Sequence, residues 1–334
     1  MVADFLERVV HGGMGKRTQE KTRKTVLDFS ASINPFPPQI AWNCDPLEIG
    51  RYPDDSYCLL KETIARSYNR DPGEICVGNG SIELIRVFCS VIFRNKERNK
   101  FFLTRPTFGE YELSANLTGA TMADNSSDAD VHFVCNPNNP TGTISSKETL
   151  LQLLENEEAQ EGVVFCDEAF IDLADPRQSL SDIGRPGLFV LQSITKSFAV
   201  PGLRFGYGFA DPELVEKMEI TRPPWCVNAY AEAFAREAVL HRKDLERSRR
   251  LIAREREWLS QELYRTGLSP CPSTANFILV EHTKPVEHLC NMLENSDILV
   301  RDCASFGLPN YIRVAVRTRE ENRILIEAIG SCLH

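Results

Sequence analysis

The chain has 334 residues, of which 42% are hydrophobic and 25% charged, as is usual for a globular protein. Its net charge of −9 argues against a nucleic-acid binder, and no apolar run approaches the roughly 18 residues that cross a bilayer. Asp4 and Glu7 interrupt the first apolar stretch, which argues against a secretory signal, and eleven cysteines without a Cys-x-x-Cys pair predict a reduced, cytoplasmic protein without disulfides or a metal site.

Residues 1–45 are expected to form an irregular N-terminal arm, because they contain a proline-rich stretch at Pro35, Pro37 and Pro38 and no clear periodicity. The basic run Lys16–Lys24 predicts a solvated loop within this arm.

Residues 46–220 have the pattern of a large α/β domain. A helix over residues 59–70 is followed by a short strand at Ile75–Val77, a glycine turn and a helix over Ile82–Phe93. Gly80 and Ser81 therefore lie near a helix N-terminus, where free backbone N–H groups and the helix dipole favour a phosphate.

Short apolar runs bounded by turn signals predict the strands Phe101–Leu103, Val131–Cys135, Val163–Cys166, Phe189–Gln192 and Phe205–Phe209. Continuous apolar strands that alternate with helices predict a mainly parallel sheet sandwiched by helices. Ligands of such sheets bind at the carboxyl ends of the strands, which is where the polar motifs of this chain stand.

Residues 221–334 predict a smaller α+β domain, to which the N-terminal arm is expected to contribute. Its elements are a long charged helix at Asn228–Arg265, strands at Asn276–Val280, Ile298–Val300 and Ile312–Val316, and a final helix near Arg323–Ile329.

One motif places a lysine at the end of an apolar strand, in the run Ser193-Ile194-Thr195-Lys196. A lysine is costly to bury in its charged form, but it is plausible there if its amine forms an imine. Arg204 follows closely and suits a phosphate dianion, and Ser193 adds a hydroxyl donor.

Two further motifs follow neighbouring strands. Asp167 stands where its carboxylate would keep a pyridine nitrogen protonated, which makes the ring an electron sink. Asn139, in the rigid turn Asn136–Gly142, could donate an amide N–H to a phenolic oxygen. Singly, each motif also fits a plain turn, an N-cap or a surface residue, so only their order and spacing together carry weight.

With Asn139, Asp167, Lys196 and Arg204 in this order, nearly the whole chain resembles the fold-type I pyridoxal 5'-phosphate (PLP) enzymes of the aspartate aminotransferase superfamily. The resemblance implies that Lys196 forms a Schiff base with PLP, that Asp167 pairs with the pyridinium and that Asn139 bonds the ring hydroxyl. It also implies that the cofactor phosphate is bound by Gly80, Ser81, Ser193 and Arg204.

Two aromatic positions extend the resemblance. Phe108 matches the side chain that stacks on the cofactor ring, and Tyr52 matches a tyrosine that reaches the cofactor phosphate of the partner subunit, which implies a homodimer with shared active sites. Phe170 is a departure, because many relatives have a tyrosine there that donates a hydrogen bond to the ring hydroxyl.

Two branches of the superfamily, histidinol-phosphate aminotransferases and threonine-phosphate decarboxylases, both have an arginine pair that Arg301 and Arg313 match. Two guanidinium groups suit the phosphate and carboxylate of a substrate. The N-terminal runs His11-Gly12-Gly13 and Leu27–Pro35 resemble the decarboxylase branch. This implies that the substrate is bound by His11, Gly12, Ser32, Asn139, Arg301 and Arg313, although the family more often has asparagine where Ser32 stands.

The chain is therefore interpreted as a PLP-dependent carboxy-lyase of the cobalamin pathway. It would convert O-phospho-L-threonine to (R)-1-amino-2-propanol O-2-phosphate. The alternative is transamination of a phosphorylated amine with 2-oxoglutarate. A third interpretation, a non-catalytic PLP-fold binding module, is disfavoured because the lysine, aspartate and arginine are all present. Neither a nucleic acid nor a membrane is expected as a partner.

Overall fold

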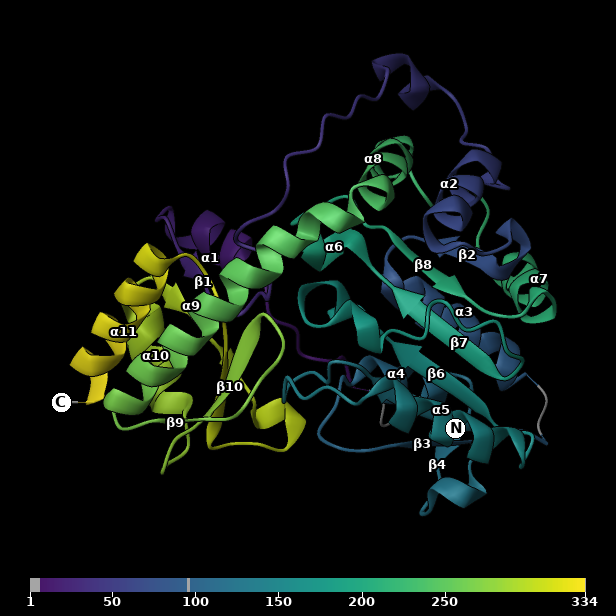
Figure 1. Ribbon diagram of the computed structural model, residues 1–334. Coiled ribbons are helices and arrows are strands. Elements are labelled where there is room, and N and C mark those ends of the chain that lie inside the picture. The colour runs from purple at the N-terminus through teal and green to yellow at the C-terminus, as the bar shows by residue number, and fades with distance from the viewer. Residues whose placement is uncertain (1–6, 95–96, 334) are drawn as a thin grey trace.

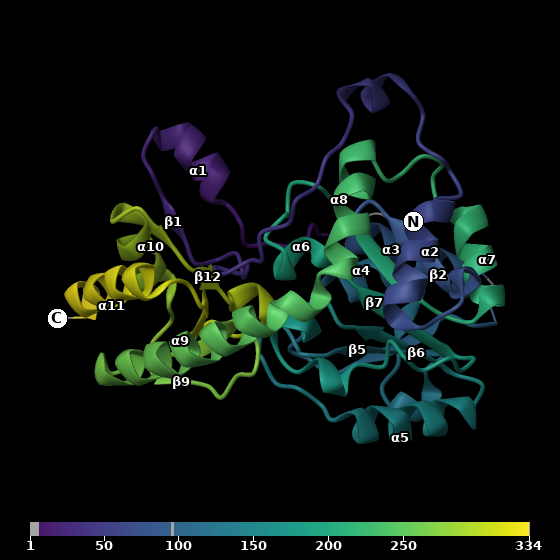
Figure 2. The same ribbon diagram turned by 45° about the horizontal axis from the view of Figure 1, so that its top comes forward.

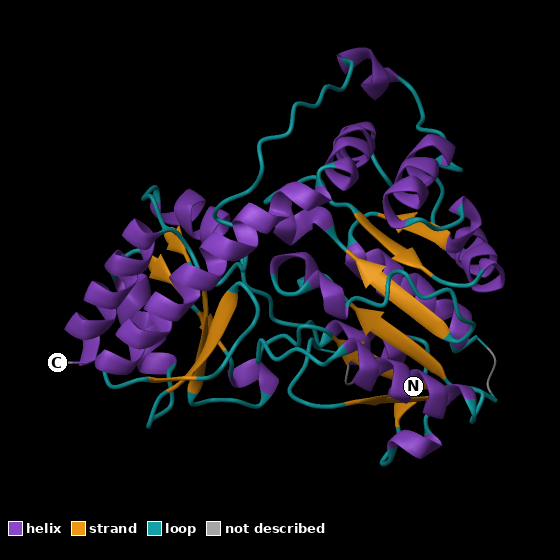
Figure 3. Cartoon of the chain, viewed as in Figure 1, coloured by secondary structure: helices purple, strands orange, loops and turns teal. Residues whose placement is uncertain are grey.

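The computed structural model describes residues 7–94 and 97–333 and has the α/β architecture expected from the sequence. Figure 1 shows two parts, a larger one around a seven-stranded sheet and a smaller one around a four-stranded sheet. Figure 3 shows the strands of the two sheets as separate groups with helices around them. The domain boundaries at residues 45 and 220 remain predictions.

The large part alternates strands and helices along the chain. Its strands are β2 (Ile75–Gly78), β3 (Lys100–Leu103), β4 (Thr121–Met122), β5 (Val131–Cys135), β6 (Val163–Asp167), β7 (Leu188–Gln192) and β8 (Gly206–Phe209). Its helices are α2 (Cys58–Tyr68), α3 (Ser81–Ile92), α4 (Glu110–Leu117), α5 (Lys147–Glu158), α6 (Ile194–Ser197) and α7 (Pro212–Thr221).

The sheet order is β2-β8-β7-β6-β5-β3-β4, and every neighbouring pair is parallel except those of β8, which runs antiparallel to β2 and β7. The mainly parallel sheet is thereby confirmed. Because β8 is reversed, its first residue, Gly206, pairs with the last residue of β2, Gly78. The segment before β8 therefore lies at the same edge as the carboxyl ends of the other strands.

Apolar side chains hold the large sheet rigid below that edge. On one face, the rings of Phe88, Phe165 and Phe189 pack with centroids 4.7 to 5.3 Å apart. These rings are fully buried, and burying each aromatic side chain contributes on the order of 2 kcal/mol. The loops at the sheet edge are therefore attached to a well-packed, rigid sheet.

Helix α8 (Ala229–Leu240) packs against α2 of the large part, and α9 (Leu245–Arg265) leads from it into the small part. The other elements of the small part are β9 (Ser269–Pro270), β10 (Phe277–Glu281), α10 (Glu287–Asn295), β11 (Ile298–Leu299), β12 (Arg301–Asp302), β13 (Tyr311–Ala315) and α11 (Arg319–Leu333). The four-stranded sheet is antiparallel, in the order β12-β13-β10-β9.

The single long helix predicted over Asn228–Arg265 is wrong, because α8 ends at Leu240 and a short turn precedes α9. The Arg242 side chain turns inward there, donates to Asp172 at 3.0 Å and lies 3.8 Å from the centroid of the Tyr68 ring. This tertiary contact favours the break, although the local sequence is compatible with a continuous helix.

The N-terminal arm is more regular than predicted. The basic run expected as a loop contains α1 (Gly15–Thr22), and Leu27–Asp28 form β1, which pairs in parallel with β11. Figure 2 shows α1 and β1 on the side of the small part. Leu27 and Phe29 donate backbone hydrogen bonds to residues 297 and 299, so the arm is tied to the small part. No helix among the described residues is long and apolar enough to cross a membrane.

Candidate active site

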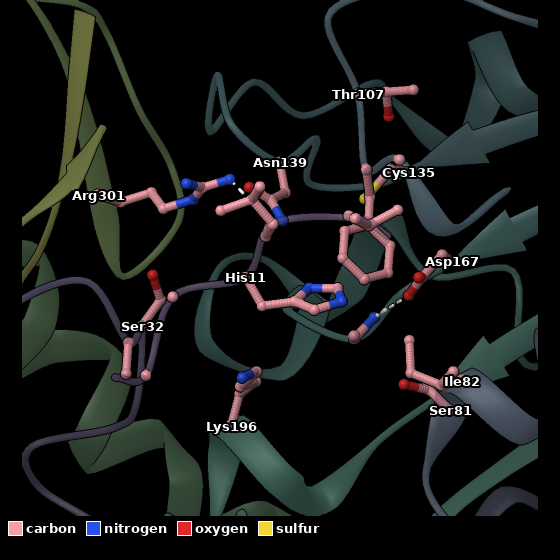
Figure 4. Close-up of a pocket in the computed structure, with 18 of the residues that line it drawn as sticks. His11, Ser32, Ser81, Ile82, Thr107, Cys135, Asn139, Asp167, Lys196 and Arg301 are labelled. Atoms are coloured by element: carbon pink, nitrogen blue, oxygen red, sulfur yellow. Dashed lines mark hydrogen bonds between the residues drawn. The ribbon is translucent and has the colours of Figure 1, made fainter. Parts of the chain in front are cut away.

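A cavity of about 910 Å³ lies between the carboxyl edge of the large sheet, the small sheet and the N-terminal arm. Figure 4 shows side chains from all three regions meeting in it. Twelve of the residues predicted for the site line this cavity: His11, Gly12, Ser32, Ser81, Phe108, Asn139, Asp167, Ser193, Lys196, Arg204, Arg301 and Arg313. The fold therefore brings together residues that are up to 302 positions apart in the chain, from His11 to Arg313.

Ser81 and Arg204 form one end of the cavity, and Gly80 lies directly beside them. Ser81 begins the 12-residue helix α3, and Arg204 precedes the reversed strand β8 at the same sheet edge. Gly80 does not line the cavity, but its φ of 79° and its packing explain the glycine, because a Cβ there would lie 2.4 Å from an Arg204 nitrogen. Gly206 allows an equally close approach, since its Cβ would lie 2.6 Å from the Ser81 nitrogen. A helix N-terminus beside a guanidinium suits a phosphate group.

Asp167 is the last residue of β6 and is buried at the bottom of the cavity. Its Oδ2 accepts a hydrogen bond from the Tyr111 hydroxyl at 2.7 Å, and its Oδ1 accepts one from the Ala169 N–H at 2.9 Å. Burial raises the pKa of this carboxyl, and the two hydrogen bonds oppose that shift. A buried carboxylate with these contacts is suited to face a cationic ring nitrogen.

Tyr111 was not identified from the sequence. It lies one turn beyond Phe108 in α4 and is fully buried, with its ring stacked on Phe133 at 5.5 Å. The only signal was a tyrosine three positions after the predicted stacking aromatic, and it stands between two glutamates. Its contact with the Asp167 carboxylate becomes visible only when the positions of the sheet and of α4 relative to each other are known.

Lys196 lies in α6, a one-turn helix after β7, so its predicted position at the end of the strand itself is wrong. Ser193 is the N-cap of this helix and accepts a hydrogen bond from the Thr195 N–H at 3.2 Å. Burial, together with the charges of Arg313 and Arg204, lowers the pKa of the lysine to about 8. Near neutral pH a substantial share of this amine can therefore be uncharged and nucleophilic.

Asn34 anchors the lysine helix to the N-terminal arm, a role that the sequence did not reveal. Its backbone N–H donates to the Lys196 carbonyl at 3.0 Å, and its side-chain amide donates to the Ser197 carbonyl at 2.7 Å. The arm thus helps to fix the position of the amine as well as closing one side of the cavity.

Arg313 connects the small sheet to the large one. It donates hydrogen bonds to Oδ1 of Asn139 and, at 2.9 Å, to the Ser30 carbonyl, while its Nε has no partner among the described residues. Burial lowers its pKa to about 10. Because Oδ1 of Asn139 accepts from Arg313, the Asn139 Nδ2 group remains as a donor at the cavity wall.

Arg301, His11 and Ser32 form the opposite end of the cavity. Arg301 donates to the Val10 carbonyl at 2.8 Å and to the Ser305 hydroxyl at 2.6 Å. Burial lowers the pKa of this guanidinium as well. The Ser32 hydroxyl is buried and has no partner among the described residues. Cationic and unpartnered polar groups together predict that this end takes an anion.

Tyr52 and Phe170 complete the predicted positions. Tyr52 does not line the cavity, is 79% exposed and contacts Trp225, with ring centroids 4.6 Å apart and ring planes tilted by 34°. Phe170 lies in the cavity wall and packs against the edge of Phe277 at 5.1 Å. Phenylalanine has no hydroxyl, so residue 170 itself cannot donate a hydrogen bond into the cavity.

Comparisons with known proteins all match this chain to one family. The family described as aminotransferase class I and II matches residues 47–329. The chain is 34% identical over 327 residues to a protein of Caldanaerobacter subterraneus provisionally named threonine-phosphate decarboxylase, covering 90% of this chain and 88% of that protein. It is 31% identical over 306 residues to the histidinol-phosphate aminotransferase of Symbiobacterium thermophilum, covering 86% and 83%.

The solved structures agree with this match at the level of the fold. The histidinol-phosphate aminotransferase of Sinorhizobium meliloti, in complex with pyridoxal-5'-phosphate, has a TM-score of 0.85 at 18% identity, covering 99% of this chain and 96% of that one. The family match and the relatives at 34% and 31% identity confirm the predicted superfamily, whereas the roles of single residues are not tested by these matches.

Proposed function

The chain belongs to the aminotransferase class I and II family and uses pyridoxal 5'-phosphate, and from that premise we propose that it decarboxylates O-phospho-L-threonine. The product would be (R)-1-amino-2-propanol O-2-phosphate, made in the cytoplasm for cobalamin biosynthesis. The observation that carries this proposal is the cationic end of the cavity, which Arg301, Arg313 and the N-terminal arm form.

The residues at the other end fit the cofactor. Ser81, Arg204 and Ser193 would hold its phosphate, Asp167 its pyridine nitrogen and Lys196 its aldehyde carbon. Asn139 Nδ2 would donate to the ring hydroxyl, and Phe108 would cover one ring face. When bound, PLP supplies an electron sink that stabilises the negative charge left on the substrate Cα after a bond is broken.

The reaction specificity depends on which Cα bond stands perpendicular to the cofactor ring, since only that bond overlaps its π system. In a decarboxylase this must be the bond to the carboxylate. Arg301, Arg313 and His11 would hold the substrate phosphate and carboxylate so that the carboxylate lies out of the ring plane. Two partly desolvated guanidinium groups are suited to two such anions.

Lys196 has a second role in this proposal, as the proton donor. When the bond from Cα to the carboxylate breaks, CO2 leaves and a proton must be added at Cα. Lys196, whose pKa is lowered to about 8, can donate that proton and be recharged from solvent near neutral pH.

Transamination by the same residues is the second candidate, because histidinol-phosphate aminotransferases also match the chain at 31% identity. The two reactions are distinguished by supplying O-phospho-L-threonine labelled in its carboxyl group to the holoenzyme. Release of labelled CO2 without any keto acid supports the decarboxylase. A requirement for 2-oxoglutarate, with glutamate as product, supports the aminotransferase. Tight PLP binding without turnover of any phosphorylated amine would support the non-catalytic module.

We also propose a homodimer with shared sites. Tyr52, Leu47 and Ile49 lie on one segment and are all strongly exposed, and the Tyr52 ring contacts the exposed Trp225. Exposed apolar side chains of this size favour an interface. Light scattering should give twice the chain mass. Mixing Lys196→Ala with Tyr52→Ala subunits should restore activity, because one site of the hybrid dimer would be intact. No gain over the separate variants would contradict sharing.

A further inference from the structure

The N-terminal arm is attached to both sides of the cavity through two neighbouring residues. The Val10 carbonyl accepts a hydrogen bond from Arg301 of the small sheet, and His11 Nε2 lies 2.8 Å from Oε1 of Glu110 on α4. Figure 4 shows the His11 ring among the other cavity side chains. His11 is therefore fixed at its Nε2 side, while no described residue is hydrogen-bonded to its Nδ1.

Glu110 is an unusual residue to find at this place. It begins α4 and is 4% exposed, and its second oxygen, Oε2, has no hydrogen-bond partner among the described residues. The His11 hydrogen bond lowers the pKa of Glu110, burial raises it, and Arg86, 3.6 Å from Oε2, lowers it further, with a net lowering. The group is therefore held as a buried carboxylate, and its contacts with His11 and Arg86 offset the cost of burying its charge.

The hydrogen-bond geometry of imidazole lets the negative charge of Glu110 affect how His11 binds an anion. A ring that donates through Nε2 to Glu110 can also donate through Nδ1 to a substrate anion only when it carries both protons. An anion at Nδ1 and the carboxylate at Nε2 would then hold the charged ring between them. A neutral acceptor in place of Glu110 would orient the ring equally well but would stabilise its charged form less.

We propose that Glu110 is a positioning residue for the anionic end of the substrate, acting through His11 and itself paired with Arg86. The proposal rests on the proposed function, in which His11 contacts the phosphate or carboxylate of the substrate. It adds a specificity element on the large part, opposite the two arginines of the small sheet. Glu110 touches neither substrate nor cofactor in this scheme.

Glu110→Gln tests the charge while it retains an oxygen that accepts from His11. In the holoenzyme we expect the KM for O-phospho-L-threonine to rise about tenfold, with kcat changed by less than about twofold. The affinity for inorganic phosphate, measured by calorimetry, should fall by a similar factor. Glu213→Gln is the matched control, because Glu213 is an exposed carboxylate paired with Lys217 on the distant α7, and it should change neither quantity.

A double-mutant cycle separates positioning from a general structural effect. If Glu110 acts through His11, then Glu110→Gln should add less than about twofold to the KM in a His11→Asn background. Full additivity of the two changes, or an effect of Glu110→Gln no larger than that of the control, would overturn the proposal. Arg86→Gln is a second variant on an exposed side chain, expected to raise the KM about threefold, so a poorly folded Glu110 variant would not end the test.

The phosphate titration tests the role of Glu110 independently of the decarboxylase reaction. If the wild-type holoenzyme releases no CO2 from O-phospho-L-threonine, the decarboxylase assignment fails. Phosphate affinity in the same variants still decides whether Glu110 supports anion binding, since any phosphorylated substrate would use the same end of the cavity. If phosphate binds equally to the wild type and to Glu110→Gln, Glu110 has no such role, whatever the reaction proves to be.

Discussion

The two ends of the cavity differ in how they are built. At the cofactor end, Asp167 ends one strand of the large sheet, and Ser81 and Lys196 follow two others, with the lysine helix also tied to the N-terminal arm through Asn34. At the substrate end, Arg301 and Arg313 bond residues of the N-terminal arm 291 and 283 positions away. The first end is fixed by a rigid sheet, whereas the second exists only when arm and small part pack together. Changes at the first should therefore affect the chemistry, and changes at the second should affect substrate choice.

The largest effect is expected from Lys196→Ala at the cofactor end. Removing the amine removes both the attachment point of the cofactor and the proposed proton donor, so turnover should fall by about 1,000-fold or more. The Tm of the apoprotein should hardly change, because no described residue is hydrogen-bonded to the amine and its burial is costly. Borohydride reduction followed by peptide mass spectrometry should find PLP on residue 196 of the wild type. A variant that keeps most of its activity would break the assignment of this end.

Arg313→Lys is expected to affect both ends, because Arg313 bonds Asn139 as well as the arm. A lysine cannot make both contacts and bind an anion, so the KM should rise about 100-fold and the cofactor absorbance should shift. Arg301→Lys is the matched comparison, since Arg301 contacts the arm and Ser305 but not Asn139. It should raise the KM without moving the absorbance. Equal absorbance shifts in both variants would contradict the prediction that only Arg313 acts on the cofactor end.

The pKa of Lys196 predicts a pH effect at the cofactor end. Because this pKa is lowered to about 8 from 10.5, the amine loses its proton as the pH rises through 8, well below the range of an ordinary lysine. The rate of PLP incorporation into the apoprotein should therefore rise about tenfold between pH 7 and 9 and then level off. Absorbance after rapid mixing measures this rate, with intrinsic fluorescence as the check that the fold persists. A rate still climbing steeply above pH 9.5 would contradict the lowered pKa.

A smaller effect is expected from Tyr111→Phe, which deletes the hydroxyl that donates to Asp167. The carboxylate would lose one of its two hydrogen bonds, so unfolding of the apoprotein should become easier by about 1 kcal/mol. Turnover should fall only a few-fold, because Asp167 and its Ala169 contact remain. Tyr264→Phe, on an exposed residue of α9, is the control. Chemical denaturation and steady-state kinetics check the two parts, and an unchanged stability would show that the hydrogen bond contributes little.

The same difference explains what could be predicted from the sequence. The residues of the cofactor end could be predicted from the sequence because they follow successive apolar strands at recognisable turns. Parallel strands bring such turns to one edge of a sheet. The roles of Tyr111, Glu110 and Asn34 were missed because each depends on a partner that is distant in sequence. Helix α1 was missed because Gly15–Thr22 contains no apolar residue and so shows no periodicity.

The most direct test of the division into two ends is a crystal structure of the holoenzyme with 1-amino-2-propanol O-2-phosphate bound. We expect two separate phosphate groups, one contacted by Ser81 and Arg204 and the other contacted by at least two of His11, Arg301 and Arg313. The pyridine nitrogen should lie against Asp167. A ligand phosphate that lies away from all three of those side chains, with the cofactor bound as described, would contradict the assignment of the substrate end.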